Sequence, residues 1–213
     1  MMLLTVLRDP DRAVAVSRDP ARQGAFARSC LIAIVVGGAL FGAAVGSFRG
    51  GAQIAVAAAK IPVVTLLTMA VAGPALLAIA AAFGRLWTLP QAIALMLAAG
   101  ARSSLVLGAL SPVLWLAVDL GAGHQAAKLA ATLAYAAAGL SGASLLLRGL
   151  GREAGQLGAA GCFAAVFLVA GAQTAWVLRP YLGDPRDEVV PVLVSDRVEG
   201  GVLGSLRGSP WSR

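Results

Sequence analysis

The residues able to do chemistry in this chain are mostly polar side chains at the ends of long apolar stretches. If those stretches cross a membrane, as argued below, eight of the polar residues fall near its outer face. Asp119 could pair with Lys128 or Arg179, and such a cluster would suit an anionic headgroup or a partner's carboxylate. We favour interfacial salt bridging and snorkelling of these side chains, because all of them lie near helix ends. The outer-face polar cluster comprises Arg49, Gln53, Lys60, Asp119, Lys128, Gln173, Trp176 and Arg179.

Residue patterns typical of enzymes are missing from the sequence. It shows no recognisable catalytic triplet of serine, histidine and acid, no glycine-rich phosphate loop and no pair of carboxylates suited to acid–base catalysis. The single histidine, His124, and the two distant cysteines, Cys30 and Cys162, do not have the spacing of a zinc site. A proton relay would need several buried acids, and the apolar stretches offer only Asp119. We therefore expect no catalytic activity, no metal and no cofactor, and we interpret both cysteines as small helix-packing residues.

Hydrophobic patterning predicts an all-α integral membrane protein. Hydrophobic residues make up 59% of the chain and charged residues 13%, whereas about 25% charged is typical of soluble domains. Each apolar stretch is close to the ~20 residues that cross ~30 Å of hydrocarbon. The net charge of +7 is spread over the loops and lacks interleaved aromatic residues, which argues against nucleic acid as a partner. The expected bundle has about five transmembrane helices, at residues 30–48, 61–83, 103–121, 126–147 and 159–178.

Small residues recur at helical spacing along several of these stretches. Gly38, Gly42 and Gly46 form a glycine groove along which another helix backbone can approach closely. Similar faces occur at Ala131, Tyr135 and Gly139, and around Gly161 and Ala165. These faces could serve dimerisation, but we expect most of them to pack within the subunit.

The amino-terminal segment, residues 1–28, is basic and contains Arg-Asp-Pro twice. Aspartate is a good N-cap and proline suits the first helical turn, so short surface helices are expected to start at Pro10 and Pro20. The positive-inside rule places this arginine-rich segment in the cytoplasm. Residues 29–182 then form the transmembrane domain. Five crossings put the tail, residues 183–213, on the outer side, where 189–194 could form a short strand or extended arm.

Two regions fit this pattern less regularly. Residues 89–121 are too long for one simple span, so residues 90–101, which precede Arg102, are expected to form an additional interfacial or half-inserted helix. If that piece crossed the membrane instead, there would be six spans and the carboxyl terminus would lie inside. Residues 52–60 are expected along the outer interface, with Pro62 starting the second span.

Short strings in the sequence resemble a group of poorly characterised bacterial multi-pass membrane proteins. The strings are Arg49-Gly50-Gly51, Gln53, Lys60 with Pro62, and the Gln-x-x-Trp-x-Leu-Arg-Pro motif that begins at Gln173. The general layout also looks like that of Yip1-like proteins. The resemblance implies a protein of the bacterial cytoplasmic (inner) membrane without assigned chemistry. The sequence departs from the group in having Tyr181 after the final proline and few aromatic residues in its tail.

These observations favour a non-enzymatic accessory or structural subunit that packs with other integral membrane proteins, as a hetero- or homo-oligomer, and contacts membrane lipids. The first alternative is a small transporter or channel. In it, helix breaks at Pro74 and Pro112 would open a path lined by hydroxyl groups, although those hydroxyls could equally cap the broken helices. The second alternative is a Yip1-like membrane-organising protein. The hydroxyl residues in question are Thr65, Thr68, Ser104 and Ser111.

Overall fold

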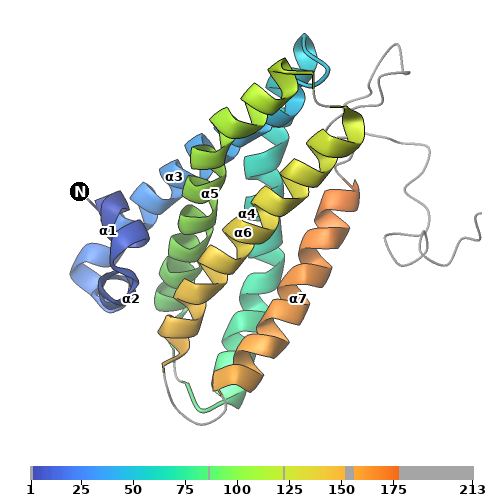
Figure 1. The fold of residues 1–213 in the computed structure, drawn as a ribbon. Coiled ribbons are helices and arrows are strands. Elements are labelled where there is room, and N and C mark those ends of the chain that lie inside the picture. Colours follow the sequence, from blue (N-terminus) through green and yellow to red (C-terminus); the bar gives the residue numbers. More distant parts are fainter. Residues whose placement is uncertain (1, 86, 122, 152–155, 178–213) are drawn as a thin grey trace, which may run out of the picture.

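The fold consists of α-helices that run up and down a single bundle (Figure 1). A computed structural model describes residues 2–85, 87–121, 123–151 and 156–177. In this part of the chain the helices are α1 (Met2–Arg8), α2 (Pro10–Arg18), α3 (Pro20–Gly46), α4 (Ala52–Ala82), α5 (Leu89–Asp119), α6 (His124–Leu150) and α7 (Gln156–Val177).

Four of these helices, α3 to α6, are long and apolar enough to cross a membrane, and α7 contains a shorter apolar segment, Gly158–Gly171. An α-helix suits this environment because it satisfies its backbone hydrogen bonds internally. The predicted all-α membrane class is therefore supported by helix length and composition. The expected tail and its 189–194 strand lie outside the described residues.

The two short amino-terminal helices fold as a hairpin, here called the N-terminal hairpin (α1 and α2), against one flank of the bundle (Figure 1). As predicted, α2 starts at Pro10 and α3 at Pro20. The Asp9 carboxylate accepts a hydrogen bond from the Arg12 backbone N–H at 3.0 Å, and Asp19 accepts one from Ala21 N–H at 3.0 Å. The helix at Pro20 is not short, however, because it continues to Gly46 as the first long apolar helix.

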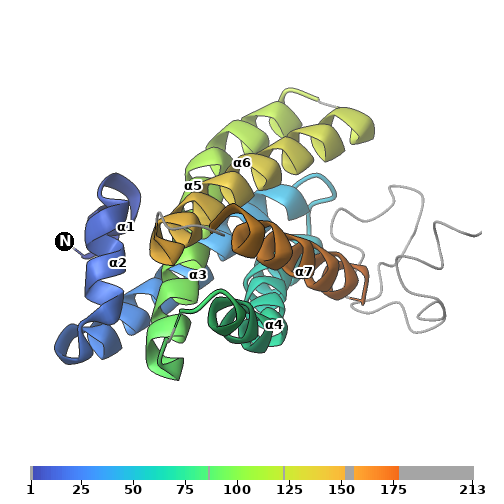
Figure 2. The same ribbon diagram turned by 90° about the horizontal axis from the view of Figure 1, so that it is seen from below.

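Helices α3 and α5 form the centre of the bundle, with α4 and α6 on either side of them and α7 packed mainly against α4 (Figure 2). Their backbones touch where small residues meet. A Cβ atom added at Gly37 would overlap the Ser104 carbonyl, and one at Gly108 would lie 3.2 Å from the Gly37 Cα. Glycine permits this approach because it has no side chain. The α3–α5 contact therefore leaves no gap at this level of the bundle.

The predicted glycine groove on α3 faces α4. A Cβ at Gly38 would lie 3.3 Å from the Pro62 nitrogen, one at Gly42 would lie 2.7 Å from the Ala58 Cα, and one at Gly46 would lie 2.6 Å from the Gln53 carbonyl oxygen. The two helices are joined by a short turn in which Gly50 and Gly51 have φ angles of 77° and 57°, a region that glycine enters without steric cost. The groove thus serves packing within the subunit.

Two predictions of where helices begin and end were wrong. Residues 90–101 and the following span form one helix, α5, so the described residues contain no separate half-inserted helix there. Likewise, residues 52–60 are the first turns of α4, and Pro62 lies inside that helix. Charged side chains do not break a helix if they find partners, and proline removes only one backbone hydrogen bond.

Hydroxyl groups satisfy helix carbonyls near the prolines. Proline prevents a hydrogen bond to the carbonyl four residues earlier, and for Pro112 this is the Gly108 carbonyl. The Ser111 hydroxyl donates to that same oxygen at 2.7 Å. Thr65 donates to the Ile61 carbonyl at 3.0 Å, whereas the buried Thr68 hydroxyl has no hydrogen-bond partner among the described residues.

We predict that Gly42→Ala destabilises the protein by about 1 to 3 kcal/mol, because the added methyl group would force α3 and α4 apart. Gly24→Ala is the matched control: it lies on the same helix with nothing within 4 Å of its Cβ position. The control should leave stability unchanged or raise it by up to ~1 kcal/mol. Equilibrium unfolding in mixed detergent micelles measures both, and equal effects would contradict close α3–α4 packing.

Candidate functional site

Arginine side chains bind the N-terminal hairpin to α5 and α6, and we call this group of contacts the arginine dock. It is composed of Arg102 on α5, Arg148 near the end of α6 and Arg18 at the end of α2. Their partners come from residues distant in sequence, so the site exists only in the folded chain.

Arg102 links three helices. Its Nε donates to the Ser141 hydroxyl on α6 at 2.9 Å, and its Nη1 donates to the Val6 carbonyl on α1 at 3.3 Å. Arg102 lies 13 residues after Leu89, so it is about 20 Å along α5 at 1.5 Å per residue. A charge at this depth in a spanning helix needs hydrogen-bond acceptors. The hairpin supplies one of them through its backbone.

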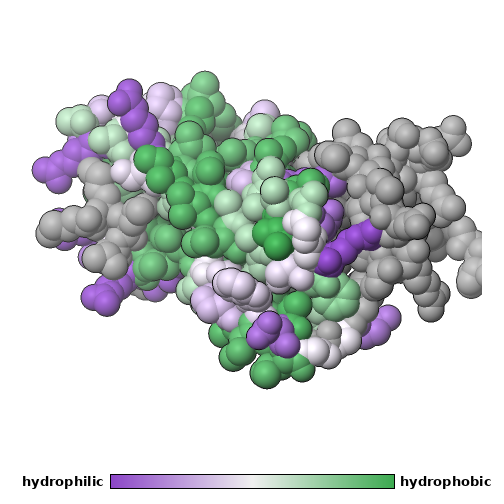
Figure 3. Space-filling view, turned by 90° about the horizontal axis from the view of Figure 1, so that it is seen from above, coloured by the Kyte–Doolittle hydropathy of each residue, from purple (hydrophilic) through white to green (hydrophobic). Residues whose placement is uncertain are grey.

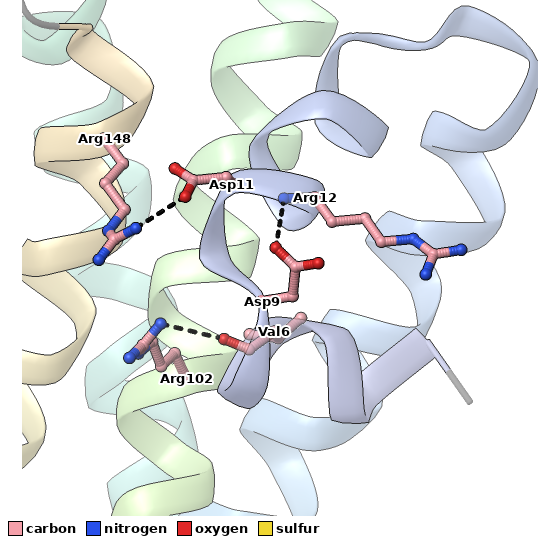
Figure 4. A network of polar contacts seen from close by, with 6 residues as sticks. All are labelled: Val6, Asp9, Asp11, Arg12, Arg102 and Arg148. Carbon is pink, nitrogen blue, oxygen red and sulfur yellow. Dashed lines mark hydrogen bonds and ion pairs between the residues drawn. The ribbon is translucent and has the colours of Figure 1, made fainter.

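The other two arginines, Arg148 and Arg18, form contacts between the N-terminal hairpin and the last turn of α6. Arg148 Nη1 lies 2.8 Å from Asp11 Oδ2, and Arg18 Nη2 donates to the Gly149 carbonyl at 2.8 Å. The Gly149 carbonyl belongs to the last turn of its helix, where unpaired carbonyls carry partial negative charge. Figure 4 shows the Arg102 and Arg148 side chains on the same side of the hairpin, while Arg12 extends away from both. The dock therefore gathers positive charge between the hairpin and the bundle.

Apolar contacts complete this interface. Val6 and Ala13 on the hairpin are fully buried, and Val14 is almost so. They belong to one core cluster with Phe26 on α3 and Leu145 on α6. Seen from above, hydrophilic residues gather on the side where α1 and α2 lie, and the middle of the face is largely hydrophobic (Figure 3). The hairpin is thus part of the packed structure.

Part of the predicted outer-face polar cluster lies within the described residues. Because the helices alternate in direction, the members that lie in described helices and turns belong to the end of the bundle where α4 and α6 begin. Gln53 and Lys60 are buried in α4, and Arg49 is half-buried in the turn before it. Asp119 and Lys128 are exposed.

One predicted pairing in this outer-face cluster can be compared with the structure. Asp119 and Lys128 both lie in the described part of the chain, and they do not form the predicted ion pair with each other. Gln173 and Trp176 belong to α7, but their side chains, like Arg179, lie outside what the structure describes. The structure therefore supports the cluster only as a shared end of the bundle.

The arginine dock was not predicted from the sequence, although two of the segments that form it were interpreted. Arg102 interrupts an apolar run, and it was read as a boundary between two helices. Asp11 and Arg18 lie in the repeated Arg-Asp-Pro segment, which was read as a membrane-surface element alone. Neither pattern indicates that the segment folds back onto α5 and α6. The contact between the hairpin and these two helices joins residues far apart in the sequence, so no short sequence motif predicts it.

No metal centre appears in the described ranges, where no three residues of the types His, Cys, Asp or Glu come together. Cys30 is buried in the core beside Phe26, in keeping with a packing role, while Cys162 is exposed on α7. The predicted packing role therefore fits Cys30 within this chain but not Cys162. The dock itself offers hydrogen-bond donors and positive charge, which suit binding of an anion or anchoring of the hairpin.

The fold and this site define a helical-bundle protein with several helices of membrane-spanning character. Comparison of the chain with protein-family models, curated proteins and solved structures gave no match. The resemblance to bacterial multi-pass membrane proteins and to Yip1-like proteins therefore stays a prediction.

We predict that Ser141→Ala lowers the free energy of unfolding by about 1 to 2 kcal/mol, because the Arg102 guanidinium loses a hydrogen-bond acceptor. Ser144→Ala is the control, since the Ser144 hydroxyl donates only to the Ser141 carbonyl within the same helix, at 2.7 Å. Equilibrium unfolding in mixed micelles compares the two variants. An equal loss in both would show that the Arg102 contact contributes little to stability.

Proposed function

We propose that the protein is a non-enzymatic accessory subunit that packs with another integral membrane protein. The observation that carries this proposal is an uncovered stripe of small residues on α6. Thr132, Ala136, Gly139 and Ala143 are all exposed, and they follow one another at intervals of four, three and four residues. On a helix this spacing places them on one face.

Small residues on a lipid-facing surface favour helix packing over lipid contact. Lipid chains are as apolar as leucine, so association of helices in a membrane depends on close backbone approach, which small side chains permit. A Cβ at Gly139 would have nothing within 4 Å. The apolar part of α6, like that of α4, is less buried in the subunit than that of α3, so α6 has surface left for a partner.

The transporter or channel alternative has less support. Its proposed lining hydroxyls at Ser111 and Thr65 are bound to carbonyls of their own helices, and Ser104 lies buried where α3 and α5 touch. Thr68 alone among the four has a buried hydroxyl without a partner in the described chain. A Yip1-like membrane-organising role would depend on the basic N-terminal hairpin, and it is compatible with a subunit role.

Gly139→Leu is expected to abolish association with the partner while leaving the subunit folded, because the new side chain enters space that is open in the subunit. Gly161→Leu on α7 is the control, since its Cβ position is equally open. Purification from native membranes in mild detergent, with identification of co-purified chains, measures the effect. A lone monomer from the wild-type protein would overturn the proposal, and loss of the partner only with Gly161→Leu would move the contact to α7.

We further propose five crossings of a bacterial cytoplasmic membrane, with the N-terminal hairpin inside and the carboxyl terminus outside. The support is the number of apolar helices, including the shorter segment of α7, together with the arginines at the hairpin end. Alkaline phosphatase fused after Arg213 should be active, and green fluorescent protein at the same position should be dark. The reverse pattern would mean that the chain crosses an even number of times.

A further inference from the structure

We propose that the arginine dock binds the headgroup phosphate of an anionic phospholipid between the N-terminal hairpin and α6. The site is formed by Arg148, Arg102 and Arg18 together with Asp11, and it does not depend on the partner proposed above. Guanidinium groups match phosphate because they are planar, permanently charged and able to donate two parallel hydrogen bonds.

The charges at the dock do not balance. The hairpin and its junction with α3 carry three aspartates, but Asp9 and Asp19 serve as caps of α2 and α3, and Asp19 also lies 3.5 Å from Arg22. Among the contacts described for the dock, Asp11 alone offers a carboxylate to the three arginines. Arg148 is also close enough to Arg102 to interact with it electrostatically. Within the described residues, the dock therefore carries excess positive charge that an anion would offset.

The Asp11 carboxylate can be displaced. Its side chain is 76% exposed and that of Arg148 is 47% exposed, and ion pairs between exposed groups contribute little to stability. By contrast, the Arg102 and Arg18 contacts to Ser141, Val6 and Gly149 hold those side chains in place. A phosphate can therefore replace Asp11 at Arg148 without dismantling the rest of the dock.

The surface next to the dock suits acyl chains, which favours a lipid over free phosphate. Leu140 and Leu133 on α6 are 74% and 60% exposed. At 100° per residue, both lie within about 80° of Arg148 around the helix, and Leu140 is about two turns away along it. A headgroup at Arg148 would thus leave its chains beside exposed leucines.

Arg148, which would bind the headgroup, and the proposed partner face are on different sides of α6, although Leu140 lies only about 40° around the helix from Ala136. Gly139 lies about 180° around the helix from Arg148, and Ala136 and Ala143 lie more than about 100° from it. Headgroup binding at Arg148 and partner binding at Gly139 can therefore be tested separately. Failure of one would leave the other unaffected.

The experiment measures binding of phosphatidylglycerol to the full-length protein in detergent by native mass spectrometry, with phosphatidylcholine and inorganic phosphate as comparison ligands. Arg148→Gln should weaken phosphatidylglycerol binding about tenfold, the effect of losing one charge-assisted contact. Asp11→Asn should strengthen it, because the competing carboxylate is gone. Arg12→Gln is the matched control: it removes the same charge from the hairpin, but its side chain points away from the dock (Figure 4), and its affinity should stay within about twofold of wild type.

Equal weakening by Arg148→Gln and Arg12→Gln would overturn the proposal in favour of diffuse attraction. Equal binding of phosphatidylcholine would also overturn it, and inorganic phosphate binding as tightly as the lipid would exclude a lipid site. If Arg148→Gln does not fold, the Asp11→Asn variant decides the question, since unchanged affinity in that variant contradicts displacement of Asp11.

Discussion

The backbone of α3 packs directly against those of α4 and α5, and the positions of the other helices follow from this contact. Gly37 brings α3 against α5 at Ser104, and Gly42 brings the next face of α3 against α4 at Ala57 and Ala58. Helices in a membrane gain little from excluding lipid, so such backbone contacts replace the hydrophobic effect as the source of packing energy. Once α3, α4 and α5 are joined, α6 and α7 add to the outer sides of α5 and α4.

This central packing also explains why the N-terminal hairpin docks where it does. Residues of α3, α5 and α6 form a common apolar surface that includes Phe26, Leu95 and Leu145, and the hairpin covers it with Val6 and Val14. The same placement brings a backbone carbonyl to Arg102. A charged residue in the middle of an apolar helix is thus accommodated by a segment more than ninety positions earlier in the chain.

Local sequence rules worked well at helix starts. Asp9 with Pro10 and Asp19 with Pro20 marked the beginnings of two helices, because capping depends only on residues within one turn. The same local rules failed at Lys60 and Arg102, where the sequence analysis placed helix ends. Both residues lie inside long helices, since helix continuity depends on backbone hydrogen bonds and on partners for the charge. The partners of Arg102 come from other helices and leave no trace near it in the sequence.

Hydropathy and helical spacing are properties of consecutive residues, so they were enough to predict membrane-spanning helices and the glycine groove of Gly38, Gly42 and Gly46. The packing of the helices, by contrast, brings α4 into that groove and places Arg102, Arg148 and Arg18 at one dock. The physical reason is that a guanidinium finds its acceptor through space. The acceptors at Val6, Asp11 and Gly149 reach the arginines only when the bundle has closed and the hairpin has folded back onto it.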